Sequence, residues 1–354
     1  GVSESDVQSE KYRQQKQLVK QTIKQNRRLV RVSTGLNRAA VPLCEKDINR
    51  ISGFAYKHLG FVKEEFKRVF REVTKVGNRL QITQVVDGTP ADKAGLKEGD
   101  IIKSINGWNP PKSPPENTFG IQMGPEDFQE HISTKLDELT EEGESRTFKI
   151  NRKGRDKTFK VRSVQTCNYN IKLLNKSSIN AVANGSEVGV TKGMMRFVDS
   201  DTELSIVVAH EIAHNALNHI QKQQQNQLMG TFLGALIDAA AASQGVYTGG
   251  AGAQAGASAG ALSFSKEFEA EADYAGLYIM ARADLSINQA PSFWRKMATA
   301  NPGSNNQGVN ATHPTSAFRF KQLEQTIKEI QKKRKRKEPL LPEKKQYEPE
   351  DAEN

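Results

Sequence analysis

Hydrophobic and polar positions follow three different patterns in the first half of the chain. Residues 1–34 are polar and rich in Gln, Lys and Arg, so they form either an exposed helix or a disordered segment. Apolar residues recur at helical spacing from about residue 45 to residue 72, which predicts a helix there. Residues 80–161 contain short alternating runs separated by Gly and Pro, a pattern that is typical of a small β-rich module.

The pattern changes again in the second half. Three short apolar runs within 171–190 predict strands, and a long apolar helix is expected from about Thr202. Ser200 and Glu203 support this helix, because they match the S-x-x-E capping box that begins many helices. The last segment, 331–354, is charged and contains several prolines, so we expect a disordered tail.

Composition adds length and charge to this outline. A chain of 354 residues is long enough for two domains. The net charge is +10, and much of the excess lies in two basic segments, 11–31 and 332–337. Such blocks are usually solvated, and an anionic membrane surface or an acidic partner is the alternative. No nucleic-acid-binding motif accompanies the charge, so nucleic acid is not an expected partner.

The two cysteines bear on the cellular compartment, and one stretch with a single charge raises the question of a membrane span. Cys44 and Cys167 do not form a C-x-x-C pair, which argues against a cysteine metal site and leaves one disulfide possible in an oxidising compartment. Between Met229 and Ser265 the only charged residue is Asp238, yet Gly and Ala dominate. A spanning helix needs about 20 strongly apolar residues, so we do not expect one here.

A metal site is predicted inside the expected long helix. His210, Glu211 and His214 form an H-E-x-x-H motif. Residues four apart lie on one helix face, so both imidazoles can reach one metal ion, and Glu211 can contact a water molecule beside it. Leu217 and Ile220 stand where a metzincin has Gly and His, which excludes that class.

A second segment offers the third ligand. Glu269 and Asp273 are four residues apart and share a helix face. Glu269 can complete a His₂Glu zinc site, and Asp273 can orient a ligand histidine through its free ring N–H. His219 stands five residues after His214, so we expect it to point away from the ligand face and to be structural.

Together these motifs resemble the HtpX, BepA and CAAX-prenyl-protease superfamily of gluzincin zinc metallopeptidases. The matching residues are the H-E-x-x-H helix and the E-x-x-A-D segment, with further likeness at 179–181 and 312–314. The resemblance covers about residues 165–325. It implies that His210, His214 and Glu269 bind one Zn²⁺ per chain, and that Glu211 is the catalytic base of peptide-bond hydrolysis.

The resemblance leaves three roles open. His313 and Arg319 are the candidate catalytic residues that would stabilise the oxyanion. His313 could instead bind zinc in a resting state, and both residues could be a helix cap or part of an internal salt bridge. HtpX-like members carry transmembrane helices near these motifs, whereas this chain has the Ala/Gly-rich segment 229–264, either a mobile lid or a helical hairpin packed as core.

Residues 85–102 resemble the PDZ signature of bacterial proteases. The order is strand, tight turn, short helix from Ala91, turn and strand. Residues 147–150 and 158–161 are the expected closing strands, and 128–139 is a further helix. PDZ domains bind extended peptides by strand addition. The alternative is a spacer or regulator without a peptide ligand.

The expected fold class is α+β: a mainly helical zincin-type metallopeptidase domain with a short sheet, plus a small β-rich PDZ domain. The expected parts are a polar segment (1–34), a helical part of the peptidase (35–75), a PDZ-like domain (76–164), the catalytic domain (165–330) and the tail (331–354). We expect a bacterial protease of the periplasm or cell envelope, with or without a lipid anchor. It would act on unfolded, misassembled or membrane-associated proteins. The alternative is a latent protease acting mainly as a PDZ-based binding or chaperone protein.

Overall fold

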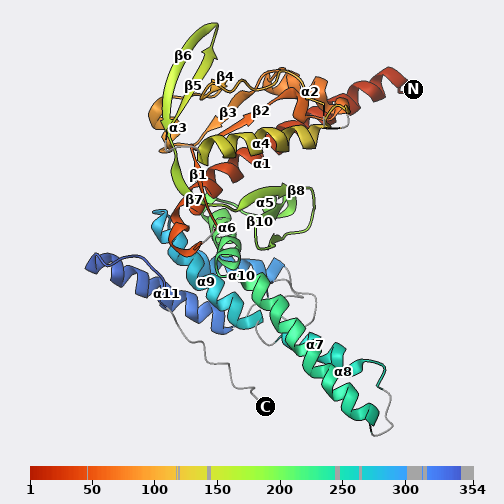
Figure 1. The fold of residues 1–354 in the computed structure, drawn as a ribbon, viewed down its shortest axis with the longest axis vertical. Helices are drawn as coiled ribbons and strands as arrows, with labels where there is room; N and C mark the ends of the chain where they lie inside the picture. Colours follow the sequence, from red (N-terminus) through yellow and green to blue (C-terminus); the bar gives the residue numbers. More distant parts are fainter. Residues whose placement is uncertain are drawn as a thin grey trace. The chain divides into compact units, whose positions relative to one another are not determined.

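The chain forms two compact units in the computed structural model (Figure 1). Unit 1 contains residues 1–34 and 49–166, and unit 2 contains residues 35–48 and 167–354. The residues that the structure describes are 1–45, 47–116, 118, 120–141, 145–243, 248–262, 265–300, 313 and 317–343. Helices and strands are both present in each unit, so the α+β fold class is confirmed.

The N-terminal segment is a helix. Helix α1 (Glu4–Ala39) continues for 36 residues, so the first of the two alternatives for this segment is correct. Within unit 1, Arg27 holds α1 by a bidentate ion pair with Glu98, with both N···O distances at 2.7 Å. Gln84 donates from its side-chain amide to the carbonyl oxygen of Arg27. These contacts fix a helix whose own composition is strongly polar.

Unit 1 is built on a five-stranded antiparallel sheet with the order β2-β3-β4-β5-β6. The strands are β2 (Phe54–Lys57), β3 (Gln81–Val85), β4 (Ile101–Ile105), β5 (Ser145–Arg152) and β6 (Arg155–Arg162). The helices are α2 (Glu64–Thr74), α3 (Pro90–Ala94) and α4 (Pro125–Glu141), and β1 (Ile48–Ile51) pairs with β7 (Val164–Cys167). The expected closing strands and the helix at 128–139 are confirmed.

The core of unit 1 lies between α4 and the sheet. Phe128 and Ile132 of α4 are buried in one cluster with Phe148 and Ile150 of β5. Burying side chains of this size contributes about 1.5–3 kcal/mol each. The alternating burial along β3 and β5 follows from the pleat of a strand, which turns every second side chain toward the core.

The helix predicted for 45–72 is wrong. This stretch forms β1, β2 and a 3₁₀ turn (Leu59–Phe61), and only α2, which begins at Glu64, is helical. Gly53 separates the two strands with φ of 86°, and a Cβ on it would lie 2.3 Å from Thr89. The apolar residues are β-branched or aromatic in part, and pairing with strands distant in sequence outweighs their helical spacing.

Unit 2 combines a three-stranded sheet with a set of helices. β10 (Glu187–Thr191) lies between β8 (Asn170–Leu174), parallel to it, and β9 (Ala181–Ala183), antiparallel to it. These are the strands predicted within 171–190. The helices are α5 (Lys192–Phe197), α6 (Asp201–Ala216), α7 (His219–Ser243), α8 (Ala251–Leu262), α9 (Ser265–Arg282), α10 (Ala290–Ala300) and α11 (Ala317–Arg336).

Helix α6 is the buried centre of unit 2. Ser200 caps it as predicted, since its Oγ accepts from Glu203 N–H at 3.1 Å, while the Glu203 carboxylate accepts from the N–H of Asp199, one residue before the cap, at 2.7 Å. Helix α9 packs closely on α6 at Gly276, where a Cβ would lie 3.3 Å from the backbone of Ala209. Because a larger residue would press the helices apart, Gly276 helps α9 to bring its acidic side chains toward α6.

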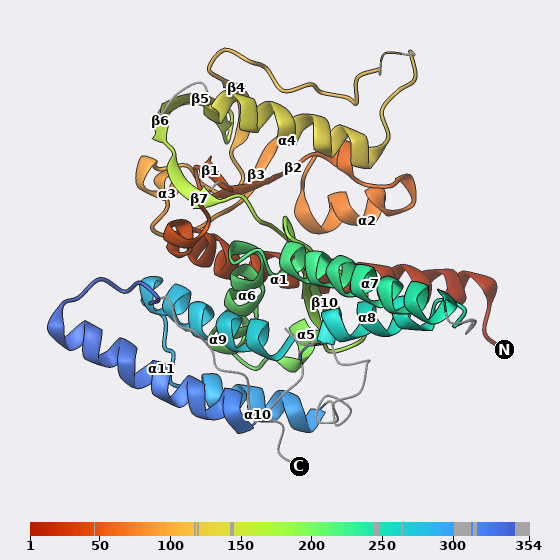
Figure 2. The same cartoon turned by 60° about the horizontal axis from the view of Figure 1, so that its bottom comes forward.

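Helices α7 and α8 lie side by side as a hairpin (Figure 2). Asp238 accepts hydrogen bonds from the N–H groups of Gly252 and Ala253, which satisfies donors at the start of α8. The hairpin expected as one alternative for 229–264 is present, but the large apolar side chains described on α7 are not packed as core. Six large apolar side chains of α7 are 52–70% exposed: Leu228, Met229, Phe232, Leu233, Leu236 and Ile237. Movement of the hairpin as a lid stays a prediction.

Gly234→Ala is expected to loosen this hairpin. A Cβ at Gly234 would lie 1.9 Å from the carbonyl oxygen of Gly252, so the helices must separate. Overpacking of this kind costs about 1–3 kcal/mol, and amide exchange in α8 should become about tenfold faster or more. Gly35→Ala is the matched control, because Gly35 is also helical and its Cβ would meet nothing within 4 Å. Unchanged exchange in Gly234→Ala would contradict the close packing.

Two further features concern the ends of unit 2. Cys44 and Cys167 form a disulfide with their Cα atoms 5.8 Å apart. Helix α11 continues to Arg336, and Lys333 then donates to the carbonyl oxygen of Leu341, so disorder does not begin at 331 as expected. Residues 344–354 of the expected tail lie outside the described residues. None of the helices in the described part of the chain is both long and apolar enough to span a membrane.

Candidate metal centre

Helix α6 presents the two histidines of the H-E-x-x-H motif to the same point. Their rings lie 4.7 Å apart between centroids, and the two Nε2 atoms are 3.1 Å apart. The helical spacing of four residues produces this arrangement, as expected. His210 and His214 are 1% and 7% exposed, so the site is nearly closed to solvent.

Glu269 and His313 complete the cluster from other parts of the chain. The Glu269 carboxylate on α9 lies 3.2 Å from His214 Nε2 and 3.3 Å from His210 Nε2. His313 Nδ1 lies 3.0 Å from Glu269 and 3.3 Å from His210 Nε2. One ligand atom from each of the four residues lies within 4.8 Å of the others.

The donor set fits zinc. Imidazole nitrogens and carboxylate oxygens are zinc ligands, and four of them suit its tetrahedral preference. Two Nε2 atoms 3.1 Å apart oppose each other through their lone pairs unless a cation or a proton lies between them. A metal ion would explain their closeness, and His210, His214, Glu269 and His313 are the residues that could hold it.

Asp273 contacts the ring nitrogen of His210 that does not face the other ligands, and Arg319 holds Asp273. Asp273 lies 3.0 Å from His210 Nδ1, as predicted for a residue that orients a ligand. Arg319 donates to both oxygens of Asp273, at 2.7 and 3.0 Å, and its Nη1 lies 2.9 Å from Glu269. Burial opposes ionisation of Asp273, but Arg319 and His210 outweigh it, so the pKa of this carboxyl lies below its ordinary value.

His219 is not among the convergent ligand atoms, as expected, but it contacts the ligand His214, which the sequence did not predict. Its Nδ1 lies 3.0 Å from Nδ1 of His214, and its Nε2 lies 3.0 Å from Glu271. The prediction extended α6 as one continuous helix, but α6 ends at Ala216 and α7 begins at His219. Asn218 between them has φ of 56°, a left-handed turn that redirects the next side chain. The Asn at position 218 could have indicated this turn, because Asn adopts the left-handed conformation more readily than most residues.

Glu211 lies beside the cluster without being part of it. Its Oε1 is 3.2 Å from His313 Nε2, while its Oε2 is buried and has no hydrogen-bond partner among the described residues. Burial opposes ionisation, but His313 and the two other histidines outweigh it, so the pKa of Glu211 lies below its ordinary value. Glu211 therefore keeps one carboxylate oxygen, Oε2, buried and without a hydrogen-bond partner among the described residues.

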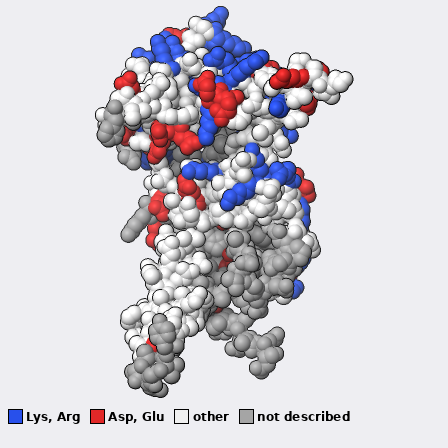
Figure 3. All heavy atoms as spheres, turned by 90° about the vertical axis from the view of Figure 1, so that its right-hand side faces the viewer, with Lys and Arg blue, Asp and Glu red and all other residues white. Residues whose placement is uncertain are grey.

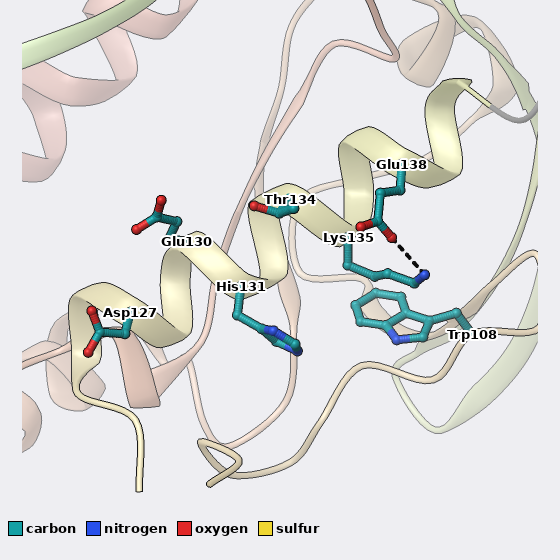
Figure 4. Close-up of a pocket in the computed structure, with 7 residues that line it drawn as sticks. All are labelled: Trp108, Asp127, Glu130, His131, Thr134, Lys135 and Glu138. Atoms are coloured by element: carbon teal, nitrogen blue, oxygen red, sulfur yellow. Dashed lines mark hydrogen bonds and ion pairs between the residues drawn. The ribbon is translucent and has the colours of Figure 1, made fainter. Parts of the chain in front are cut away.

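Unit 1 has a surface hollow whose lining residues differ from those of the metal cluster. About 510 Å³ in volume, it lies between α4 and Trp108 (Figure 4). Lys135 extends toward Trp108 and pairs with Glu138 at 2.8 Å, while His131 and Glu130 are exposed. The hollow lacks the buried, convergent polar groups that mark a reaction site.

Comparison with known proteins agrees with this geometry. The sequence profile of peptidase family M48 matches residues 145–327, and that of a PDZ domain matches residues 81–128. The mitochondrial metalloendopeptidase OMA1 of Schizosaccharomyces pombe is 26% identical over 152 residues. That match covers 42% of this chain and 44% of OMA1, so the chain spans less than half of the relative.

Two solved structures also match. The HtrA3 PDZ domain with a phage-derived ligand is 15% identical, with a TM-score of 0.22, over 34% of this chain and 88% of that domain. An HtrA-type protease, AlgW, with a decapeptide is 15% identical, with a TM-score of 0.21, over 37% and 33% of the two chains. Because the M48 profile spans more than half of the 354 residues and includes His210, His214 and Glu269, the chain belongs to peptidase family M48.

Proposed function

We propose that this M48 peptidase is a zinc-dependent endopeptidase of unfolded, misassembled or membrane-associated proteins. The observation that carries the proposal is the buried His₂Glu cluster with a buried glutamate, Glu211, next to it, one of whose carboxylate oxygens has no partner among the described residues. Zinc binding alone does not require a general base, so the presence of Glu211 favours catalysis over a purely structural metal site.

The chain's own residues account for the proton transfers. When bound, zinc polarises the scissile carbonyl and makes a water molecule acidic. Glu211 accepts the proton of the attacking water on its free Oε2 and then delivers it to the leaving amine nitrogen. Asp273 accepts from His210 and so leaves the Nε2 lone pair of that ring for the metal.

His313 and Arg319 receive different roles. The His313 ring lies between Glu211 and Glu269, in the space where water and a peptide carbonyl must enter, so we assign it to a resting state that blocks the site. Rotation of the ring away from the metal would turn it into an oxyanion donor, the other role considered for it. Arg319 contacts Asp273 and Glu269, and we assign it to positioning these carboxylates.

The α7–α8 hairpin supports the assignment to unfolded substrates. Helix α7 follows the metal-binding helix α6 directly, and its six exposed apolar side chains offer a surface to the apolar segments of an unfolded chain. One face of the hairpin, at the bottom of Figure 3, carries almost no charged residues. No Lys or Arg occurs between Lys222 and Lys266, whereas helices that bind anionic lipid usually carry both.

The PDZ domain would add substrate binding or regulation. Strand β2 is an edge strand of its sheet, and Tyr56 of β2 is hydrogen-bonded to Ser133 of α4. A peptide strand adding to this edge would lie next to α4, which is the arrangement of PDZ recognition. If the zinc site is permanently blocked, the same edge makes the chain a binding or chaperone-like protein, the alternative function.

The disulfide bears on the cellular compartment in which the protein works. Disulfides persist in oxidising compartments, so Cys44–Cys167 supports the periplasm or cell envelope of a bacterium. The basic segments at 11–31 and 332–337 would suit association with an anionic membrane surface.

Removal of the metal tests the proposal. Zinc-loaded protein is expected to cleave casein, an unfolded substrate, much faster than a folded globular protein of similar size. Chelation should abolish cleavage, and one equivalent of zinc per chain should restore it, because the four ligand atoms converge on a single site. Zinc-loaded protein that binds casein without cleaving it would favour the latent alternative over the endopeptidase.

A further inference from the structure

A row of hydrogen bonds extends from His214 away from the metal cluster. The Nε2 atom of His214 faces Glu269, whereas its Nδ1 lies 3.0 Å from Nδ1 of His219. The other ring nitrogen of His219, Nε2, lies 3.0 Å from a carboxylate oxygen of Glu271. The row therefore has the order Glu271, His219, His214 and metal cluster.

The carboxylate at the end sets the direction of every hydrogen bond in this row. An ionised Glu271 can only accept, so His219 donates to it through Nε2–H. A neutral imidazole has one N–H, which leaves a lone pair on Nδ1 of His219. That lone pair accepts from Nδ1–H of His214, and the lone pair of His214 is then on Nε2, the atom that faces the other ligands.

Packing holds the His219 ring in place. His219 is 2% exposed, and its ring stacks on Phe268 of α9 with 4.5 Å between centroids and 14° between planes. Phe268 and Glu271 flank the ligand Glu269 on the same helix. One segment of α9 therefore supplies a metal ligand together with the support for a ligand on α6.

We propose that His219, held by Glu271, is a positioning residue that keeps His214 in the tautomer and ring orientation that bind zinc. The inference rests on the zinc site of the proposed function, but not on the proposed cleavage of unfolded proteins. The two ligand histidines are then supported differently, since His210 donates to the carboxylate of Asp273 and His214 donates to a neutral imidazole.

Zinc affinity of the purified full chain, measured by competition with a chromophoric chelator, tests this role. His219→Ala is expected to weaken zinc binding by about 10–100-fold, the usual effect of losing a partner behind a ligand. His219→Asn should retain most of the affinity, because its amide oxygen can accept from Nδ1–H of His214 near the position of the lost nitrogen. Glu271→Ala should give an intermediate loss, because the ring stays but its tautomer is no longer set.

The control is His131→Ala, which removes an exposed histidine of unit 1 and should bind zinc like the wild type. Circular dichroism of the metal-free proteins shows which variants are folded, and Glu271→Ala and His219→Asn carry the test if His219→Ala is not. A folded His219→Ala with wild-type affinity, or an Asn variant as weak as the Ala variant, would overturn the proposal. Either result, with wild-type zinc binding and casein cleavage intact, leaves the endopeptidase function standing.

Discussion

Glu211→Gln is expected to keep about one zinc per chain and to lose between about a hundredfold and ten-thousandfold of the casein cleavage rate. Glutamine has the shape of glutamate but cannot take up the proton of the attacking water. Glu211 is not among the four residues whose ligand atoms converge, so the metal site itself should survive. Metal content and the initial rate of casein cleavage, measured on the same samples, separate these two effects.

The matched control for this variant is Glu324→Gln. Glu324 pairs with Arg295 and Lys321 on the surface of the same unit and is not part of the metal cluster, so its loss removes one exposed negative charge. We expect this variant to bind zinc and to cleave casein at the wild-type rate. If Glu211→Gln also cleaved at the wild-type rate, Glu211 would not be the base, and another acceptor would have to take the proton.

His313→Ala is expected to raise the rate of casein cleavage about tenfold or more. The His313 ring lies 3.0 Å from Glu269 and 3.2 Å from Glu211, so it fills the space that the reacting water needs. A state in which the ring has left would be a minor one, and minor states with populations of 0.1–10% are common. Removing the ring makes the open state the only one, and the rate rises by the reciprocal of that population.

The opposite outcome for His313 is equally informative. A loss of about a hundredfold or more, with zinc retained, would mean that the ring stabilises the oxyanion during the reaction and does not block the site. Arg319→Lys tests separately how Asp273 is positioned. Lys keeps the positive charge but loses the bidentate contact with Asp273. Zinc affinity should fall in Arg319→Lys. In His313→Ala it should fall less, because the three ligands His210, His214 and Glu269 remain.

Local features of the metal site could be predicted from the sequence, and features that depend on distant packing could not. The four-residue spacing of His210 and His214 needs only a helix, and the capping box at Ser200 identified where that helix begins. Asp273 was assigned to a histidine from motif spacing, and the structure places it on His210. These predictions required no knowledge of the rest of the fold.

The failures have separate physical causes. The helix predicted for 45–72 failed because strand pairing with β3 and the left-handed Gly53 decided the backbone there. The contact of His219 with His214 was not predicted because a single left-handed residue, Asn218, lies between the end of one helix and the start of the next. The contact of His313 with His210 joins residues 103 apart in sequence, and the order of helices in between does not determine it.

The disulfide has a consequence for how the chain could be rebuilt. Cys44 and Cys167 are 123 residues apart in sequence, yet their Cα atoms are separated by 5.8 Å, a gap that about two extended residues can bridge. Both cysteines belong to unit 2, and residues 49–166 between them belong to unit 1, so the chain leaves unit 2 and returns to it where β1 pairs with β7. The stretch is in this sense an exchangeable cassette. Another domain with neighbouring termini could replace it if residues 1–34, which contact this stretch through Arg27, are replaced with it, while the metal-binding helices keep the Cys44–Cys167 link.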